Sequence, residues 1–215
     1  MIDSYRHKGL RNKLVKILEE KGITSQPVLD AIHKIPRHFF LDKAFEDWAY
    51  KDIPFPIDNE QTISQPFTVA YQSSILDVQP KHKILEIGTG SGYQACVLSE
   101  LGAKVYTIER QENLFHKTNV LLKKIGYIKI RTFWGDGYEG LPRQAPFDRI
   151  IVTAGAPFIP KKLTEQLSIG GKLVIPVGDQ HQKMIRLTRT SAKKFEKEEF
   201  GDFKFVPFLK GVNKG

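Results

Sequence analysis

Two carboxylates and a run of glycines lie where a strand is expected to turn into a helix. The run reads Glu86-Ile87-Gly88-Thr89-Gly90-Ser91-Gly92, and Glu109 ends the next apolar segment, 17 positions after Gly92. Glycines permit positive φ and let backbone N–H groups approach a ligand closely. An acidic residue at the end of the following strand holds ribose hydroxyls in folds of this kind. The spacing therefore predicts a site for a ribose-containing cofactor.

The spacing of the glycines separates the possible cofactors. The dinucleotide fingerprint is G-x-G-x-x-G, whereas this turn reads G-x-G-x-G and is followed by Tyr93. We expect Glu86 to point into the turn, where its carboxylate would repel a phosphate. The same carboxylate would attract the ammonium and sulfonium cations of S-adenosylmethionine. We therefore expect S-adenosylmethionine, with NAD and a purely structural turn as the alternatives.

A second acidic residue follows the next expected strand, in the segment Gly135-Asp136-Gly137. An aspartate at a strand end can accept a hydrogen bond from the amino group of adenine. By itself the segment is equally typical of a plain turn. Beside the glycine turn, it predicts that Asp136 and Gly137 take part in cofactor binding.

The elements that must position these residues alternate from residue 83 onward. Strands are expected over 83–87, 104–108, 128–133, 149–153 and 172–176, with helices over 92–101, 111–125 and 163–167. Short β-rich runs that alternate with helical periods predict a parallel sheet covered on both faces. After Gly178 the alternation stops, and residues 184–190 and 204–208 are expected to form a closing antiparallel pair.

The first 80 residues have a different pattern. Leu10, Leu14 and Leu18 share one face of a helix expected over 4–21, Pro27 lies in the first turn of a second helix, and Pro66 begins a third that runs to about residue 77. Residues 36–62 between them are expected to be irregular. We predict one α/β domain with a Rossmann-like S-adenosylmethionine methyltransferase fold, built on a mostly parallel, doubly wound sheet. It has a helical, substrate-side extension over 1–80, a cofactor-binding core over 81–178 and antiparallel strands over 179–215.

The composition is that of an ordinary folded protein, with 40% hydrophobic and 27% charged residues. No apolar run approaches the roughly 18 residues that would predict a membrane-spanning helix, and the first ten residues have no apolar core of the signal-peptide kind. Cys96 is the single cysteine, so no internal disulfide can form. We expect a soluble, cytoplasmic chain without a membrane partner. The six histidines show no metal-ligand spacing, and no metal is expected.

The formal net charge of +9 makes nucleic acid the first polyanion to consider as a partner. The densest basic stretch runs from Lys193 to Lys197, but glutamates are interleaved with it over residues 196–199. This pattern is more typical of a solvated loop or turn between strands than of a binding patch. We expect no stable nucleic-acid partner. A nucleic-acid methyltransferase and a cofactor-binding module without turnover remain the alternative functions.

Several segments together resemble the protein-L-isoaspartate O-methyltransferase family. They are Pro36-Arg37-His38-Phe39-Phe40, Gln61-Thr62-Ile63-Ser64-Gln65-Pro66, residues 85–94, residues 147–154, Ile175-Pro176-Val177-Gly178 and Phe205-Val206-Pro207. The resemblance extends over nearly the whole chain. Many methyltransferases share the glycine turn, whereas the 61–66 segment about twenty residues before it is far more specific.

The resemblance implies methyl transfer from S-adenosylmethionine to the free α-carboxylate of L-isoaspartyl residues in damaged proteins and peptides, which initiates repair through a succinimide. It implies that Ser64 is the active-site serine and that Val206 and Pro207 hold the substrate backbone. Without it, Ser64 would be interpreted as a cap before the Pro66 helix. We expect a monomer whose cofactor-binding residues are Thr62, Ile63, Gln65, Glu86, Gly88, Thr89, Gly90, Ser91, Gly92, Glu109, Arg110, Asp136 and Gly137.

The segment Asp58-Asn59-Glu60 departs from the family pattern, which usually has small residues or glycine just before Gln-Thr-Ile-Ser. Two carboxylates at this place would lie near a site that must accept an anion. We expect either that they point to solvent or that they alter the affinity for substrate.

Overall fold

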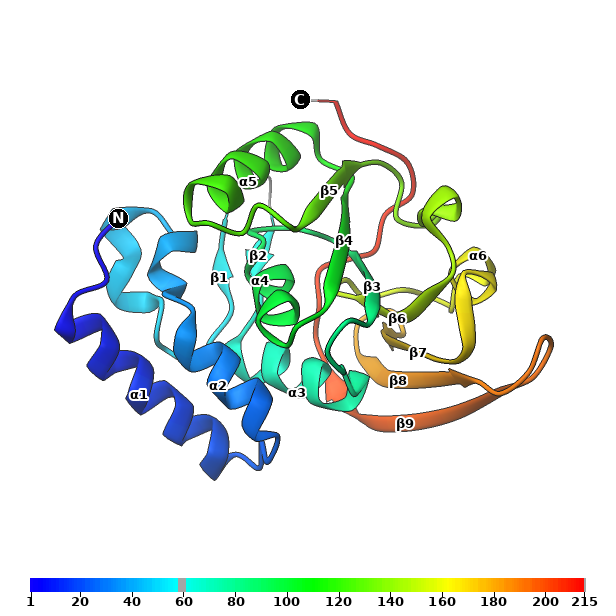
Figure 1. The fold of residues 1–215 in the computed structure, drawn as a ribbon, viewed down its shortest axis with the longest axis horizontal. Coiled ribbons are helices and arrows are strands. Elements are labelled where there is room, and N and C mark those ends of the chain that lie inside the picture. Colours follow the sequence, from blue (N-terminus) through cyan, green and yellow to red (C-terminus); the bar gives the residue numbers. More distant parts are fainter. Residues whose placement is uncertain (58–60, 215) are drawn as a thin grey trace.

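The computed structural model describes residues 1–57 and 61–214, so the Asp58–Glu60 segment lies outside the described residues. Its centre is a seven-stranded sheet in the order β5-β4-β3-β6-β7-β8-β9 (Figure 1). The strands are β3 (Lys83–Ile87), β4 (Lys104–Glu109), β5 (Arg131–Trp134), β6 (Phe147–Val152), β7 (Leu167–Val177), β8 (Gln182–Arg189) and β9 (Phe195–Phe203). The first five are parallel and the last two antiparallel to their neighbours. The predicted Rossmann-like sheet is confirmed.

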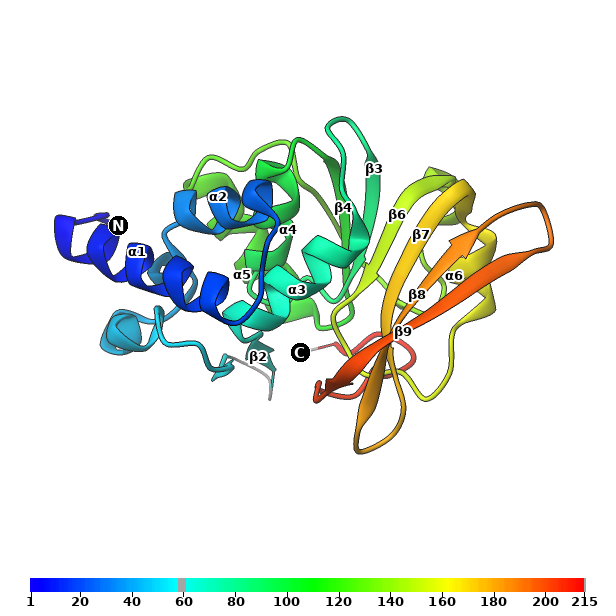
Figure 2. The same cartoon turned by 90° about the horizontal axis from the view of Figure 1, so that it is seen from below.

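Helices cover both faces of this sheet. One face carries α3 (Pro66–Leu76), α4 (Tyr93–Glu100) and α5 (Glu112–Lys124), and α1 (Tyr5–Glu20) and α2 (Gln26–Lys34) form a further layer outside them (Figure 2). The short α6 (Lys161–Glu165) packs on the other face. Among the described residues, no helix is both long and apolar enough to cross a membrane.

The alternation of side chains along β3 divides two hydrophobic cores. Ile84 belongs to the core that contains the buried residues of α1 to α4, and Leu85 and Ile87 belong to the core on the α6 face. Side chains two apart on a strand point to the same face. Glu86 therefore points with Ile84 toward the helical layers. Cys96 is fully buried in the same helical core, as expected of a small apolar side chain.

One prediction for the C-terminal region is wrong: the partner of β8 is β9, not residues 204–208. The basic stretch that begins at Lys193 starts in the exposed turn between β8 and β9, in agreement with the predicted solvated turn between strands, and its last residues enter β9. Because β9 is an edge strand exposed over most of its length, its sequence carries no apolar alternation. Residues 204–208 instead cross the carboxyl edge of the sheet, where the Gly155 N–H donates to the carbonyl of Val206 at 2.8 Å.

Smaller corrections concern the ends of elements. The helix expected over 163–167 is α6, which ends at Glu165, and β7 begins at Leu167, five residues before the expected strand. The region expected to be irregular contains the 3-10 turns Arg37–Phe40 and Lys43–Trp48 and a two-stranded sheet of β1 (Phe55–Pro56) and β2 (Thr62–Ile63). This small sheet fixes the extended backbone that leads to Ser64.

Candidate active site

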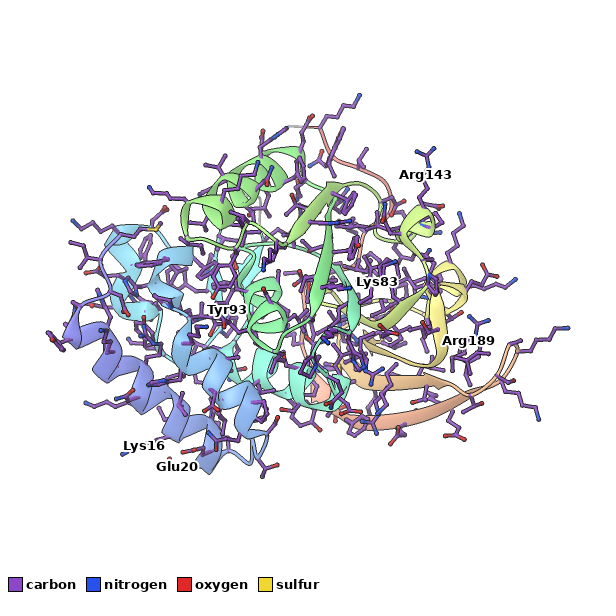
Figure 3. The ribbon with its side chains drawn as sticks, in the orientation of Figure 1. Lys16, Glu20, Lys83, Tyr93, Arg143 and Arg189 are labelled. Atoms are coloured by element: carbon purple, nitrogen blue, oxygen red, sulfur yellow. The ribbon has the colours of Figure 1, made fainter. Side chains whose placement is uncertain are left out.

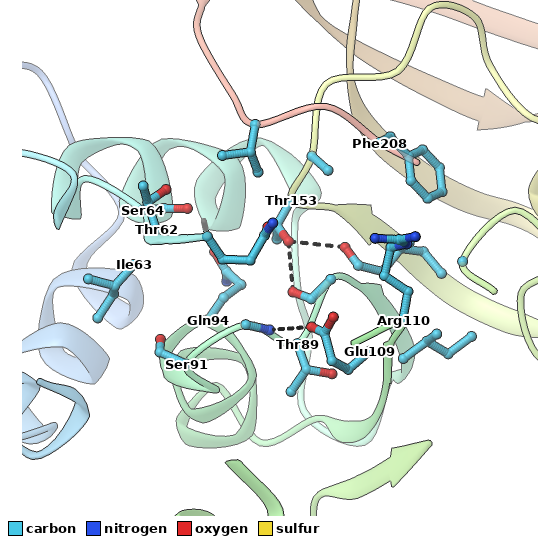
Figure 4. A pocket seen from close by; sticks show the side chains of 18 of the residues that line it. Thr62, Ile63, Ser64, Thr89, Ser91, Gln94, Glu109, Arg110, Thr153 and Phe208 are labelled. Carbon is cyan, nitrogen blue, oxygen red and sulfur yellow. Dashed lines mark hydrogen bonds between the residues drawn. The ribbon is translucent and has the colours of Figure 1, made fainter. Parts of the chain in front are cut away.

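A pocket of about 830 Å³, counting its open mouth, lies at the carboxyl ends of β3, β4 and β6 (Figure 4). Ligands of open α/β sheets bind at this edge, where strands turn into helices. Five stretches of the chain form most of the wall: residues 61–64, the glycine turn, the end of β4, the end of β6, and residues 206–209. The predicted site residues that line it are Thr62, Ile63, Ser64, Gly88, Thr89, Gly90, Ser91, Glu109, Arg110, Gly137, Val206 and Pro207.

Glu109 holds the glycine turn in place from the end of β4. Its Oε2 accepts a hydrogen bond from the Gly90 N–H at 2.9 Å (Figure 4), and its Oε1 accepts one from the Gln111 N–H, also at 2.9 Å. Burial raises the pKa of this carboxyl, and the backbone donors oppose the rise. Each oxygen retains a lone pair that could accept a ribose hydroxyl. The carboxylate thus both shapes the turn and faces the pocket.

Gly88 is required by a close approach of the end of β6. Its φ is +93°, and a Cβ at this position would lie 2.6 Å from Oγ1 of Thr153. That hydroxyl donates to the carbonyl of Gly88 at 2.8 Å (Figure 4). Gly92, by contrast, does not line the pocket. It precedes α4 with a φ of +85°, and a Cβ at this position would collide with the side chain of Thr118. The two glycines serve the turn in different ways, one at the pocket and one beneath it.

Glu86 is not part of the pocket wall, and the expectation that it points into the turn is wrong. The side chain is fully buried on the helical face of β3 because it follows the alternation of Ile84. Neither carboxyl oxygen has a hydrogen-bond partner within the part of the chain that the structure describes. Burial raises the pKa of Glu86 to about 8; the nearby Thr107 hydroxyl opposes the rise, and the charge of Glu109 adds to it.

Ser64 and Thr62 lie side by side at the pocket, while Ile63 points another way (Figure 4). The backbone of this segment is held from outside the pocket. Arg37 Nη2 donates to the carbonyl of Ser64 at 2.8 Å. The Gln65 side chain does not reach the pocket, because its Nε2 donates to the backbone carbonyl of Asp52 at 3.0 Å and to the carboxylate at 3.1 Å. Gln65 therefore anchors the segment instead of lining the cofactor site.

Asp136 also lies outside the pocket wall. Its Oδ1 accepts from the Tyr138 N–H at 2.9 Å and its Oδ2 from the Gly211 N–H at 2.8 Å. These bonds tie the C-terminal segment to the end of β5, and the ring of Phe208 stacks on Tyr138 with centroids 4.1 Å apart. The adjacent Gly137 lines the pocket as predicted, so only part of this second acidic turn contributes to the wall.

The sequence reasoning missed ten residues of the wall. They are Gln61, Val69, Ile87, Tyr93, Gln94, Ile108, Thr153, Ala154, Phe208 and Leu209. Thr153 ends an expected strand and Ala154 follows it, so the rule that ligands bind at the carboxyl ends of strands could have identified both. Gln94 is the most informative of the others: its Nε2 donates to Ser73 at 2.9 Å, and its buried Oε1 has no partner among the described residues.

A cluster of Asp3, His7 and His38 is the one group in the described chain whose ligand atoms lie close enough to hold a metal ion. Asp3 is already bound at both oxygens by Arg11, at 2.9 Å each. Both ring nitrogens of His38 are engaged, one of them with the Tyr50 hydroxyl at 2.7 Å. Asp3 and His38 are therefore engaged in a polar network of the N-terminal region, whereas Nε2 of His7 is buried and has no hydrogen-bond partner among the described residues.

Comparisons with known proteins identify the family of this chain. The family model of protein-L-isoaspartate(D-aspartate) O-methyltransferase matches residues 9–213. Proteins named protein-L-isoaspartate O-methyltransferase from Flavobacterium johnsoniae and Flavobacterium psychrophilum are 60% and 59% identical, and each alignment covers 99% of this chain and 100% of the relative.

Solved structures agree at the level of the fold. A protein-L-isoaspartate O-methyltransferase superimposes with a TM-score of 0.86 at 27% identity, covering 94% of this chain and 67% of its own. A Plasmodium falciparum protein described as such an enzyme, in complex with S-adenosyl-L-homocysteine, superimposes with a TM-score of 0.82 at 23% identity, covering 94% of this chain and 99% of its own. Because the family model spans almost the whole sequence, this chain belongs to the protein-L-isoaspartate(D-aspartate) O-methyltransferase family.

Proposed function

We propose that this protein transfers the methyl group of S-adenosylmethionine to the free α-carboxylate of L-isoaspartyl residues in damaged proteins and peptides, and so initiates their repair through a succinimide. One observation carries the proposal. The Thr62–Ser64 segment and residues 206–208 line the same pocket as the glycine turn, although they are distant in sequence. Family membership and relatives of this name at up to 60% identity over the whole chain support the activity.

The pocket has groups that fit S-adenosylmethionine. Glu109 offers lone pairs to the ribose, and the unpartnered Oε1 of Gln94 is an acceptor suited to the ammonium group. Gly88 to Ser91 and Arg110 complete the proposed binding set, together with Thr62, Ile63 and Gly137. When bound, the cofactor supplies a methyl group already activated by its sulfonium. Glu86, Gln65, Gly92 and Asp136 support this set from behind the wall.

The acceptor explains why so few catalytic groups are needed. An α-carboxylate has a pKa of about 3.5, so it is an anion at neutral pH and needs no general base. The task of the protein is to place one carboxylate oxygen in line with the methyl group and to exclude water. We assign the Ser64 hydroxyl to donate to the other oxygen and so orient it. Backbone groups of Val206 and Pro207 hold the substrate in an extended form. Main-chain hydrogen bonds of this kind depend little on the side chains of the substrate.

The partners in this proposal are isoaspartyl proteins and peptides, without a stable nucleic-acid or membrane partner. We further propose that the protein acts as a monomer in the cytoplasm. Light scattering at micromolar concentration tests the first point: a mass near 24.5 kDa is expected, and twice that value would contradict it. Fractionation of cells tests the second, with the protein expected in the cytosolic fraction and not with membranes.

Labelled methyl transfer tests the proposed reaction. An isoaspartyl peptide, its normal aspartyl isomer and mixed RNA and DNA are each incubated with the protein and labelled S-adenosylmethionine. We expect base-labile label on the isoaspartyl peptide alone. Base-stable label on nucleic acid would contradict the proposal, and tight cofactor binding without any transfer would favour a binding module.

A single substitution tests the role of Ser64. Ser64→Ala should lower kcat/KM for the isoaspartyl peptide roughly 10- to 100-fold, because one hydrogen bond to a charged group is lost. Affinity for S-adenosylhomocysteine should change little. The control is Ser191→Ala, in the turn between β8 and β9, which should behave as wild type. A Ser64→Ala enzyme with the wild-type rate would leave Ser64 only a structural role.

A further inference from the structure

A buried arginine lies behind the serine of the pocket. Arg37, the first residue of its 3-10 turn, is 1% exposed. Its Nη2 donates to the carbonyl of Ser64 at 2.8 Å, and its guanidinium lies 4.6 Å from the centroid of the Tyr93 ring. Ser64 and Tyr93 both line the pocket, and Figure 3 shows Tyr93 in the interior of the molecule. Arg37 therefore touches the pocket wall from its inner side.

Within the part of the chain that the structure describes, no carboxylate pairs directly with this guanidinium. Among the described residues it forms no ion pair within 4 Å, and its Nε and Nη1 have no hydrogen-bond partner. Asp52, the carboxylate whose charge acts on it, is bound instead by Lys21 at 2.6 Å and by the Phe67 N–H at 2.8 Å. An arginine remains protonated in a protein interior. The described residues thus place a permanent positive charge next to Ser64 without a directly paired carboxylate.

Other buried arginines of the chain are compensated. Arg11 is bound by both oxygens of Asp3, and Arg149 lies 3.5 Å from the carboxylate of Asp77 and donates to three backbone carbonyls. A buried charge without a partner is unfavourable for folding. A ligand that carries the opposite charge would remove this penalty at Arg37, and the proposed substrate delivers a carboxylate to the residue that Arg37 holds.

We propose that Arg37 is a positioning residue for the anionic substrate: it fixes the backbone of Ser64 and places a permanent positive charge behind the subsite for the α-carboxylate. The inference rests on the proposed function. The charge is already in place before the substrate arrives, so no rearrangement opposes its effect. Because the interior screens charges far less than water does, the attraction persists without direct contact.

Binding of a matched pair of ligands tests this role. The isoaspartyl peptide and its α-carboxamide analogue differ only in the charge at the acceptor, and calorimetry in the presence of S-adenosylhomocysteine measures both without turnover. The wild type should prefer the acid. Arg37→Met should lose roughly tenfold of this preference, and Arg37→Lys, which retains the charge, should keep most of it. Affinity for S-adenosylhomocysteine should stay within about twofold in all three proteins.

Arg149→Met is the control, since it removes another buried arginine near the amino end of β6, whereas the pocket lies at the carboxyl end of that strand. It should lower the free energy of unfolding without changing the acid preference. An unchanged preference in folded Arg37→Met overturns the inference. Should that variant fail to fold, Arg37→Gln, which keeps an amide donor for the Ser64 carbonyl, takes its place with the same expected result. A wild type that does not methylate the isoaspartyl peptide refutes the proposed function itself.

Discussion

The buried carboxyl of Glu86 makes the stability of the cofactor-free protein depend on pH in an unusual direction. Burial raises its pKa from the ordinary value of 4.5 to about 8 in the folded protein. Between these two values the folded protein keeps the proton that the unfolded chain has released. Unfolding then releases a proton, so the free energy of unfolding falls as the pH rises. The full contribution of Glu86 is present below pH 4.5 and has been lost above pH 8.

Replacing Glu86 with glutamine removes this titration and keeps a neutral side chain of nearly the same shape. Each pH unit in the interval lowers the free energy of unfolding by about 1.4 kcal/mol, and the whole interval by about 5 kcal/mol. A small domain has a total stability of roughly 5–15 kcal/mol, so an effect of this size is easily measured. Glu86→Gln should match the wild type near pH 5 and exceed its stability by several kcal/mol near pH 8.

Urea denaturation of the cofactor-free protein at pH 5, 6, 7 and 8 measures the effect. The informative quantity is the difference between the variant and the wild type at each pH, because the titration of all other groups cancels in it. Glu20→Gln is the control for the loss of a carboxylate at the surface, because Glu20 is exposed at the end of α1 (Figure 3). A constant difference for Glu86→Gln would show that the folded protein holds Glu86 in its ionised form, and it would contradict a raised pKa for this carboxyl.

Three further substitutions test the pocket. Gly88→Ala should weaken binding of S-adenosylhomocysteine in calorimetry at least tenfold because its Cβ would meet Thr153, whereas Gly126→Ala, with a similar φ of +91° and open space around it, should only lower stability, by roughly 1–2 kcal/mol. Glu109→Ala removes the acceptor of two backbone N–H groups, those of Gly90 and Gln111, and should weaken binding of S-adenosylhomocysteine at least tenfold. Unchanged binding would show that Glu109 does not contribute to the cofactor site. Asp136→Ala frees the C-terminal segment, and hydrogen exchange over residues 206–213 should become faster, while exchange in β4 should not.

The position of the pocket could be predicted from the sequence because it depends on local patterns. Apolar runs and glycines located β3 and β4 to within a residue, and the carboxyl ends of parallel strands meet at one edge of a sheet. β9 could not be predicted in the same way. It is an edge strand with exposed residues on most of its length, so neither face of it carries the apolar residues that reveal a strand.

The functions of individual polar residues were harder to predict because their partners are distant in sequence. Gln65 turns to Asp52, and Asp136 binds Gly211, 75 positions away. Arg37 belongs to a recognisable segment, but only the fold places it beside Ser64 and leaves it without a directly paired carboxylate among residues 1–57 and 61–214. A sequence shows which groups can donate or accept. It does not show which lone pairs the rest of the chain has already taken.

The choice of cofactor illustrates this difference. The sequence argument against a phosphate ligand depended on Glu86, which faces the helical core instead. In the structure the same conclusion follows from Glu109, because its carboxylate accepts the hydrogen bond of the Gly90 N–H at 2.9 Å. Backbone N–H groups of such a turn are the donors on which a pyrophosphate would bind. Because the Gly90 N–H already donates to Glu109, a phosphate would have one hydrogen-bond donor fewer in the turn, and the Glu109 carboxylate that faces the pocket would repel its negative charge. A cationic cofactor without a phosphate needs no such donor and is attracted by the carboxylate.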